Sequence, residues 1–244
     1  MRNLYIITGT SRGIGLALAT RLLALGHTVF GFSRNSCDLL EQYREYNHIT
    51  IDLANFSYIE EAVDRSLSAA ATNTFDAVYL INNAALVEPL RPIDKCTPEE
   101  IELNISVGLI APAIIISAFI RRTMGYPMRR KVVNITSGSG KYPVAGMAAY
   151  SSAKSGLNML TECIGLEQKQ SNNPVEVIAI DPGMVETSMQ QIARSKSEDE
   201  FEMTSFFKRA SEEKLLNTTD EIASHVLRLL EERVANGTIV KYDK

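Results

Sequence analysis

The chain has 244 residues, 45% of them hydrophobic, and a formal net charge of −4, so we expect one domain over residues 1–244 with a full-sized core. The slight acidity disfavours nucleic acid and an anionic membrane surface as partners, and no run approaches the roughly 20 apolar residues of a membrane span. Three widely separated cysteines and the lack of a targeting pattern at the start favour a cytoplasmic protein without a disulfide framework or metal site.

Seven apolar runs rich in Val, Ile and Leu recur along the chain, and they are continuous rather than strictly alternating. This pattern is typical of strands that are buried on both faces of a parallel sheet. We expect strands at residues 4–9, 28–33, 48–53, 77–83, 131–137, 175–183 and 237–243.

Helix-length segments separate these runs. Leu16, Ala19, Leu22 and Leu23 form one stripe at helical spacing, which Gly26 closes. Because strands and helices alternate, the sequence predicts an α/β fold: a single doubly wound Rossmann-type domain with a seven-stranded parallel sheet flanked by helices. The other helices are expected at 57–71, 98–124, 147–170 and 218–234, with Thr219 or Asp220 capping the last.

A glycine-rich loop follows the first predicted strand, with the spacing TGxxxGxG from Thr8 to Gly15. Gly9 permits a tight turn, Gly13 lets the backbone approach a pyrophosphate, and Gly15 lets the next helix pack close to the strand. The N-terminus of that helix adds free N–H groups and a partial positive charge. The loop therefore predicts a dinucleotide-binding site.

The choice of dinucleotide depends on the end of the second strand, where a site for NAD usually carries an acid for the ribose hydroxyl. This chain has Ser33 and Arg34 there, Arg12 lies in the glycine loop, and Asp38 is too far along to replace the acid. Two guanidinium groups that converge on one ribose favour a 2′-phosphate, so we expect NADP(H). The alternative is that both arginines are solvated surface residues.

Polar and small residues also follow the third and fourth strands. Asp52-Leu53 ends the third, where a carboxylate can meet the adenine amino group. Asn83, Ala84 and Ala85 end the fourth, where small side chains let a cofactor lie flat with Asn83 beside the nicotinamide ribose. The alternative for this position is a loop-forming Asn-Asn pair.

A third set of residues has the chemistry of a proton-transfer device. Tyr150 and Lys154 stand one helical turn apart in AAYSSAKSG, and Ser137 ends the apolar run KVVNITS. An ammonium group on the same helix face favours the phenolate of a tyrosine, and a serine hydroxyl can hold a substrate oxygen against that phenol. The alternative is an ordinary exposed helix that carries a Tyr and a Lys on one face.

Together with Pro182-Gly183 after the sixth strand, these motifs resemble the short-chain dehydrogenase/reductase family over essentially the whole chain. The stretches NITSGSGKYPVAGMAAYSSAKSGLNM, DPGMVETSMQ and LINNAALVEPLRPI are most similar to its sepiapterin reductase and bacterial benzil reductase branch.

The resemblance implies a role for each residue. Tyr150 is expected to protonate a carbonyl oxygen during reduction, Lys154 to lower the tyrosine pKa and hold the nicotinamide ribose, and Ser137 to orient the carbonyl. Cofactor contacts are implied for Ser11, for the backbone N–H of Ile14 at the phosphates, and for Val185 and Thr187 near the carboxamide and pyrophosphate.

One position departs from the family pattern. Family members usually place an Asn on the helix after the fourth strand, where it holds a water in a proton relay, but Gly108 stands there in this chain. Asn104 lies one turn earlier on the same face. Three alternatives are open: Asn104 serves the relay, a water fills the gap left by the glycine, or Asn104 is a helix-surface residue.

The polar segment 186–217 interrupts the alternation of strands and helices, and we expect a mobile lid there. The alternative is an extra pair of surface helices that gates nothing. An apolar pocket in the lid would favour a bulky or aromatic substrate, although such side chains often serve only packing. The residues that could line this pocket are Met184, Met189, Phe201, Met203, Phe206 and Phe207.

The sequence thus favours an NADPH-dependent carbonyl reductase of ketones or 1,2-diketones, with benzil-like or pterin side-chain substrates and Tyr150 as the proton donor. The alternatives are an NADP(H)-binding regulatory protein with little turnover, and oxidation of an alcohol in the cell. The resemblance also implies a homo-oligomer, a dimer or tetramer, for which residues 109–120 and 155–166 are apolar enough.

Overall fold

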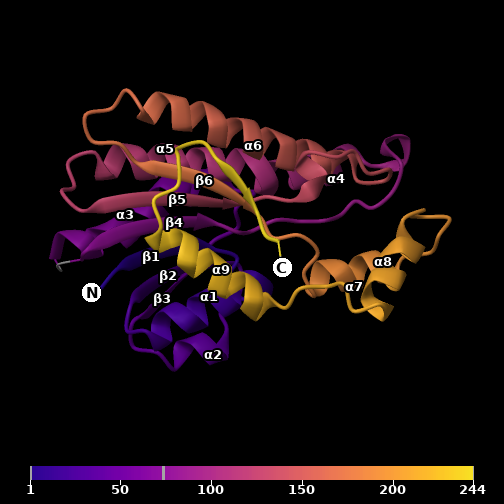
Figure 1. Ribbon diagram of the computed structural model, residues 1–244, viewed down its shortest axis with the longest axis horizontal. Coiled ribbons are helices and arrows are strands. Elements are labelled where there is room, and N and C mark those ends of the chain that lie inside the picture. The colour runs from indigo at the N-terminus through magenta and orange to yellow at the C-terminus, as the bar shows by residue number, and fades with distance from the viewer. Residues whose placement is uncertain (1, 73–74, 244) are drawn as a thin grey trace.

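The computed structural model of the protein describes residues 2–72 and 75–243. Within these residues a seven-stranded parallel sheet has the order β3-β2-β1-β4-β5-β6-β7 (Figure 1). This confirms the predicted doubly wound fold, because strand order reverses direction between β1 and β4. The strands are β1 (Leu4–Thr8), β2 (Thr28–Ser33), β3 (Tyr46–Thr50), β4 (Ala77–Asn82), β5 (Arg129–Ile135), β6 (Glu176–Asp181) and β7 (Ile239–Lys241).

Two layers of helices cover the sheet, and the strands bury side chains against both. In β1, Leu4 and Ile6 belong to one hydrophobic cluster, whereas Tyr5 and Ile7 belong to the other. This explains the continuous apolar runs. Figure 1 shows one layer with α3 (Ile59–Thr72), α4 (Pro98–Ile105), α5 (Ala111–Thr123) and α6 (Ala148–Gln168), and the other with α1 (Gly13–Ala24), the short α2 (Asp38–Glu41) and α9 (Thr219–Glu231).

The ends of two helices test the sequence predictions. Gly26 follows α1 with a φ of +79°, and its N–H donates to the carbonyl of Leu23, as expected of a glycine that closes a helix. The predicted cap of α9 is wrong by one residue: Thr218 is the cap, and it shares a reciprocal capping box with Glu221. Asp220 instead lies in the first turn and binds Arg21 of α1.

Most predicted boundaries shift by one to a few residues. The third strand ends at Thr50, so Asp52 and Leu53 lie in the loop beyond it. The fifth strand begins at Arg129, two residues before the predicted start. The prediction missed these residues because their side chains are charged and do not belong to an apolar run. The predicted helix at 98–124 is continuous over Pro98–Thr123 but includes a π-helical turn, Ser106–Ile110, between α4 and α5.

The helical run Pro98–Thr123 is more apolar than the sequence analysis allowed. By length and composition alone it is the one helix of the described residues that could cross a membrane, with a mean hydropathy of 2.2 over its most apolar window. More than half of that window (56%) is buried within the fold, and Val107, Ile115 and Phe119 of this run belong to a hydrophobic core cluster. A core helix passes the same test, so the length of this run is weak evidence for a span.

The segment 186–217 contains two helices, α7 (Ser188–Ser195) and α8 (Thr204–Glu212). They project beyond the carboxyl ends of the strands, on the right in Figure 1. Ala193, Phe201, Thr204 and Ala210 of this segment are buried. The pair of helices that the sequence analysis held as an alternative is therefore present.

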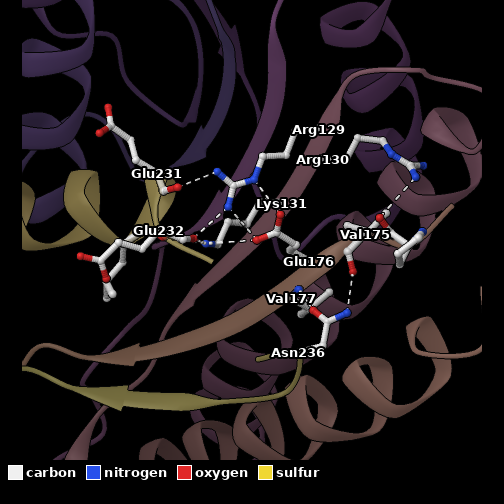
Figure 2. Close-up of polar contacts among 11 residues, drawn as sticks. Arg129, Arg130, Lys131, Val175, Glu176, Val177, Glu231, Glu232 and Asn236 are labelled. Atoms are coloured by element: carbon white, nitrogen blue, oxygen red, sulfur yellow. Dashed lines mark hydrogen bonds and ion pairs between the residues drawn. The ribbon is translucent and has the colours of Figure 1, made fainter. Parts of the chain in front are cut away.

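A polar cluster joins the amino ends of β5 and β6 to the end of α9, at the opposite end of the sheet from α7 and α8 (Figure 2). The Arg129 guanidinium binds both carboxylate oxygens of Glu176, at 2.6 and 2.7 Å, and also donates to the carbonyls of Glu231 and Glu232. Lys131 is fully buried, and its Nζ donates to the carbonyls of Leu229 and Glu232. These bonds satisfy carbonyls that the helix end leaves unpaired.

Candidate active site

A cleft of about 1030 Å³ lies at the carboxyl ends of the strands, where α7 and α8 project. The loops that follow six of the strands contribute to it, which is the usual position of ligand sites in such sheets. Every residue predicted for the site lines this cleft except Gly15 and Asn104. Those that line it are Gly9, Ser11, Arg12, Gly13, Ile14, Ser33, Arg34, Asp52, Leu53, Asn83, Ala84, Ala85, Ser137, Tyr150, Lys154, Pro182, Gly183, Val185 and Thr187.

The glycine loop has the tight geometry that its spacing predicted. Gly9 and Gly13 have φ angles of +76° and +60°, which favour glycine. A Cβ on Gly15 would lie 2.2 Å from the Gly9 carbonyl oxygen, so only glycine lets α1 approach the loop this closely. No side chain caps the start of α1, and its first N–H groups are therefore available to an anion.

Asn83 fixes this loop from the neighbouring strand. Its Nδ2 donates to the carbonyls of Thr8 and Gly9, at 2.9 and 3.2 Å, and the backbone N–H groups of Asn83 and Ala84 both donate to the Thr8 hydroxyl. The side chain therefore braces the glycine loop. Asn83 also lines the cleft, and its place beside a bound ribose stays a prediction.

Tyr46 braces the same loop from β3, which the sequence analysis did not foresee. Its hydroxyl lies 3.0 Å from the hydroxyl of the buried Thr10. The side chain passes over Gly31 of β2, where a Cβ would lie 2.4 Å from the tyrosine oxygen. A glycine inside an apolar strand signals such a close approach, and Gly31 was the available clue.

The two arginines expected at the ribose both line the cleft and are both exposed. Within residues 2–72 and 75–243, neither Arg12 nor Arg34 forms an ion pair or a side-chain hydrogen bond. Asp52 keeps one oxygen free, because only its Oδ1 accepts a bond, from the N–H of Ala54. The cleft thus presents one unpaired cation in the glycine loop, a second just after β2, and a carboxylate beyond β3.

Ser137, Tyr150 and Lys154 meet on the wall of the cleft although they come from different elements. Ser137 follows β5 and caps a short turn through the N–H of Ser139. Tyr150 and Lys154 lie in the first two turns of α6, with the Lys154 Nζ 5.8 Å from the centre of the tyrosine ring. Lys154 is 3% exposed, and its Nζ donates to the Ile135 carbonyl at 2.7 Å.

Burial controls the titration of both residues. It raises the pKa of Tyr150, and a hydrogen bond with Ser137 partly offsets the shift. Burial lowers the pKa of Lys154 to about 8. The predicted lowering of the tyrosine pKa by Lys154 is not among the causes in this structure, where the ammonium group is directed to a backbone carbonyl.

Asn104 is fully buried, so the helix-surface alternative is wrong. Its Nδ2 donates to the carbonyls of Leu86 and Glu88, at 2.9 and 2.6 Å, while its Oδ1 is buried without a partner among the described residues. The residue therefore holds the loop after β4, part of which lines the cleft.

Gly108 lies in the π-helical turn and faces α6. A Cβ there would lie 2.9 Å from the Ala153 Cβ, because α6 packs close at this point. The glycine allows this close packing next to Lys154. The alternative of a water beside the glycine stays a prediction.

The turn after β6 is clamped by Asn217, another residue that the sequence analysis missed. Gly183 has a φ of +66°. The Asn217 Nδ2 donates to the Pro182 carbonyl, and the Asn217 backbone forms a bridge with Met184 and Glu186. Thr187 lies beside the glycine loop, since a Cβ added to Gly13 would lie 3.6 Å from the Thr187 Cγ2. The segment 186–217 thus returns to the strand end from which it started.

Apolar side chains line the substrate side of the cleft, next to Tyr150. Met184 and Phe206 line the cleft as predicted, but Phe201 is buried instead and packs on Gly146. We call the rest of this surface the apolar wall, and it consists of Val87, Met147, Met189, Ala193, Met203 and Phe207.

The sequence matches known proteins over most of its length. The family described as short chain dehydrogenase matches residues 3–198. The benzil reductase ((S)-benzoin forming) of Bacillus subtilis is 36% identical over 236 residues, which cover 97% of this chain and 96% of that protein. The protein of the same name from Bacillus cereus is 35% identical, with 98% of both chains covered.

Solved structures share the fold at lower identity. A short chain dehydrogenase/reductase from Saccharomyces cerevisiae superposes with a TM-score of 0.86 at 21% identity, covering 99% of this chain and 96% of that one. A short chain dehydrogenase from Burkholderia cenocepacia in complex with NADP has a TM-score of 0.76 at 24% identity, covering 98% and 95%. A 4-hydroxyisoleucine dehydrogenase complexed with NADH has a TM-score of 0.80 at 23% identity, covering 99% and 97%.

Proposed function

The chain belongs to the short-chain dehydrogenase family, and we propose that it is an NADPH-dependent reductase of ketones or 1,2-diketones in which Tyr150 donates the proton. Oxidoreductase chemistry on a carbonyl group follows from the family and from the benzil reductases that it resembles. The observation that carries the proposal is the meeting of Ser137, Tyr150 and Lys154 on one wall of a cleft that also holds the glycine loop.

The reaction adds a hydride to the carbonyl carbon and a proton to its oxygen, so that ketone, NADPH and a proton give alcohol and NADP⁺. NADPH supplies the hydride when it is bound. Ser137 holds the carbonyl oxygen by a hydrogen bond, and Tyr150 gives that oxygen its proton. The raised pKa of Tyr150 keeps the phenol protonated at neutral pH, ready to act as an acid. In the proposal the Lys154 ammonium, 5.8 Å from the centre of the ring, then turns from the Ile135 carbonyl toward the phenolate that is left and stabilises it.

The residues of the cleft fit a dinucleotide with a 2′-phosphate. The uncapped start of α1 and the close approach at Gly15 suit a pyrophosphate. Arg12 and Arg34 are unpaired with any carboxylate of the described chain, and a phosphate would give both a partner. We therefore propose NADPH rather than NADH.

An apolar wall beside the phenol supports a bulky or aromatic substrate. Both bacterial relatives are named for the reduction of benzil, a 1,2-diketone with two phenyl rings. We propose a benzil-like substrate, with a pterin side chain as the alternative.

A cofactor-binding regulator with little turnover is the main rival, and the absence of the usual relay Asn at Gly108 favours it. Oxidation of an alcohol in the cell is a further alternative. The proposal assigns Asn104 a supporting role, in which it holds the loop 86–88 at the cleft.

The test is the consumption of NADPH by the purified protein with a panel of ketones and 1,2-diketones. The proposal expects turnover, fastest with aromatic diketones. Tight NADPH binding without turnover of any substrate in the panel would favour the regulator instead.

We also propose that the protein is a cytoplasmic homo-oligomer, a dimer or tetramer, and that 186–217 gates the cleft as a lid. Ile110, Met159 and Leu166 are exposed on the turn before α5 and on α6, within the segments expected to pair. Light scattering should then give two or four times the chain mass of 27.0 kDa.

A further inference from the structure

One polar side chain interrupts the apolar wall. Gln190 lies on α7, next to Met189 and one turn before Ala193, and it lines the cleft with both of them. Its side chain is more than nine-tenths buried, with 8% exposure. A glutamine at such a position is unexpected, because buried polar groups are normally paired.

The Gln190 amide has no partner in the part of the chain that the structure describes. Its Oε1 is sealed from solvent without a hydrogen bond. Its Nε2 has no acceptor either, but this nitrogen is not sealed from solvent. Since Gln190 lines the cleft, the amide nitrogen is the polar atom of this side chain that a bound molecule can reach.

An unpaired buried amide is destabilising, and a nonpolar side chain of similar size would fit this wall better. Because the fold gains nothing from the amide, we look for its partner in a ligand. That partner must be an acceptor near the apolar wall and beyond the carbonyl held by Ser137 and Tyr150. A 1,2-diketone has such an acceptor, the oxygen of its second carbonyl.

We propose that Gln190 determines specificity for 1,2-dicarbonyl substrates by donating a hydrogen bond from Nε2 to the carbonyl that is not reduced. This inference rests on the proposed function and adds the substrate feature that the site recognises. The diketone, NADPH and a proton give an α-hydroxyketone and NADP⁺. The second carbonyl persists in the product, so Gln190 holds it throughout and only one carbonyl is reduced.

Two substrates of the same size separate this role from general packing. Benzil has two adjacent carbonyls between phenyl rings, and deoxybenzoin has a methylene in place of one of them. For Gln190→Leu, we expect kcat/KM for benzil to fall about tenfold, the effect of one lost hydrogen bond, while kcat/KM for deoxybenzoin stays within about twofold. Gln191→Leu, on the exposed side of the same helix, should change neither value.

Stability and cofactor affinity provide the second readout. Gln190→Met removes the amide but keeps the length of the side chain, so its Tm should equal or exceed that of the wild type, and its Kd for NADPH should be unchanged. Equal losses for both substrates, a weaker NADPH complex or a lower Tm would each overturn the inference. If the wild type reduces neither substrate, the proposed function itself fails. If it reduces both at a ratio that Gln190→Leu leaves unchanged, only the role of Gln190 fails.

Discussion

At the scale of single residues, Lys154 combines burial with a charge that the proposed chemistry needs. Its ammonium is nearly inaccessible and is held by one backbone carbonyl. Burial lowers its pKa to about 8, so the charged form predominates below that pH and is lost as the pH rises through it. The phenolate of Tyr150 then loses the cation that stabilises it.

We therefore expect the rate of ketone reduction, measured at saturating NADPH, to be level near neutral pH and to fall above pH about 8. Lys154→Arg keeps a charge that persists to much higher pH, so its slower reaction should lack this alkaline limb. A wild-type rate that stays level well above pH 8, or the same limb in Lys154→Arg, would contradict the assignment.

Arg34 carries the prediction of cofactor choice. It is exposed at the end of β2, lines the cleft and has no acidic partner in the described chain. Arg34→Ala should weaken NADPH binding by about tenfold to a hundredfold, the effect of charge-assisted hydrogen bonds worth about 1.5–3 kcal/mol, and leave NADH binding unchanged.

The matched control is Arg44→Ala, an exposed arginine that does not line the cleft. It should alter neither dissociation constant in a fluorescence titration. An equal loss of both cofactors in Arg34→Ala would mean that the arginine does not distinguish them.

At the scale of elements, the polar cluster of Figure 2 adds hydrogen bonds and ion pairs between β5, β6 and the end of α9, whose apolar side chains also pack together. Glu176 faces both Arg129 and the buried Lys131. Burial would raise the pKa of Glu176, but the hydrogen bond from Arg129 and the charge of Lys131 outweigh it and hold that pKa below its usual range. The contribution to stability is therefore present at neutral pH and is lost as the pH falls through the lowered pKa.

Glu176→Gln should lower the free energy of unfolding by about 2 kcal/mol at pH 7, because it leaves the buried Lys131 and the partly buried Arg129 without their carboxylate. Urea denaturation measures this loss, and the difference from the wild type should shrink at pH values below the usual range of a glutamate. The exposed pair Arg228–Glu232 provides the control, since Arg228→Gln should cost less than about 0.5 kcal/mol. Equal losses in the two variants would contradict the role of the cluster.

These elements also show which features of the fold can be predicted from the sequence and which cannot. The strands and the helix stop at Gly26 were predictable because apolar runs and glycine conformations are local signals. The start of β5 was not, since the charged Arg129 and Arg130 precede the predicted start at residue 131, and their side chains bind groups of distant segments. The helices α7 and α8 were only an alternative in the sequence analysis, because their sequence is mostly polar and few of their side chains are buried.

At the scale of the whole molecule, one sheet brings together residues that are far apart in the sequence. The motifs placed nearly every predicted site residue at the ends of strands, and the parallel order of the sheet puts those ends at one cleft. The motifs could not predict the side-chain hydrogen bonds that hold the loops of the cleft in place. Asn83, Tyr46, Asn104 and Asn217 each use side-chain bonds across the fold, and those partners are known only from the structure.

The most direct test of the account is turnover by Tyr150→Phe, measured as NADPH consumption with a diketone alongside the dissociation constant for NADPH. The substitution removes one oxygen and keeps the ring, so we expect turnover to fall by at least about a thousandfold, within the range attributed to general acid catalysis, while NADPH still binds with its wild-type affinity. Turnover close to that of the wild type in this variant would contradict the account, because the proton would then come from another group.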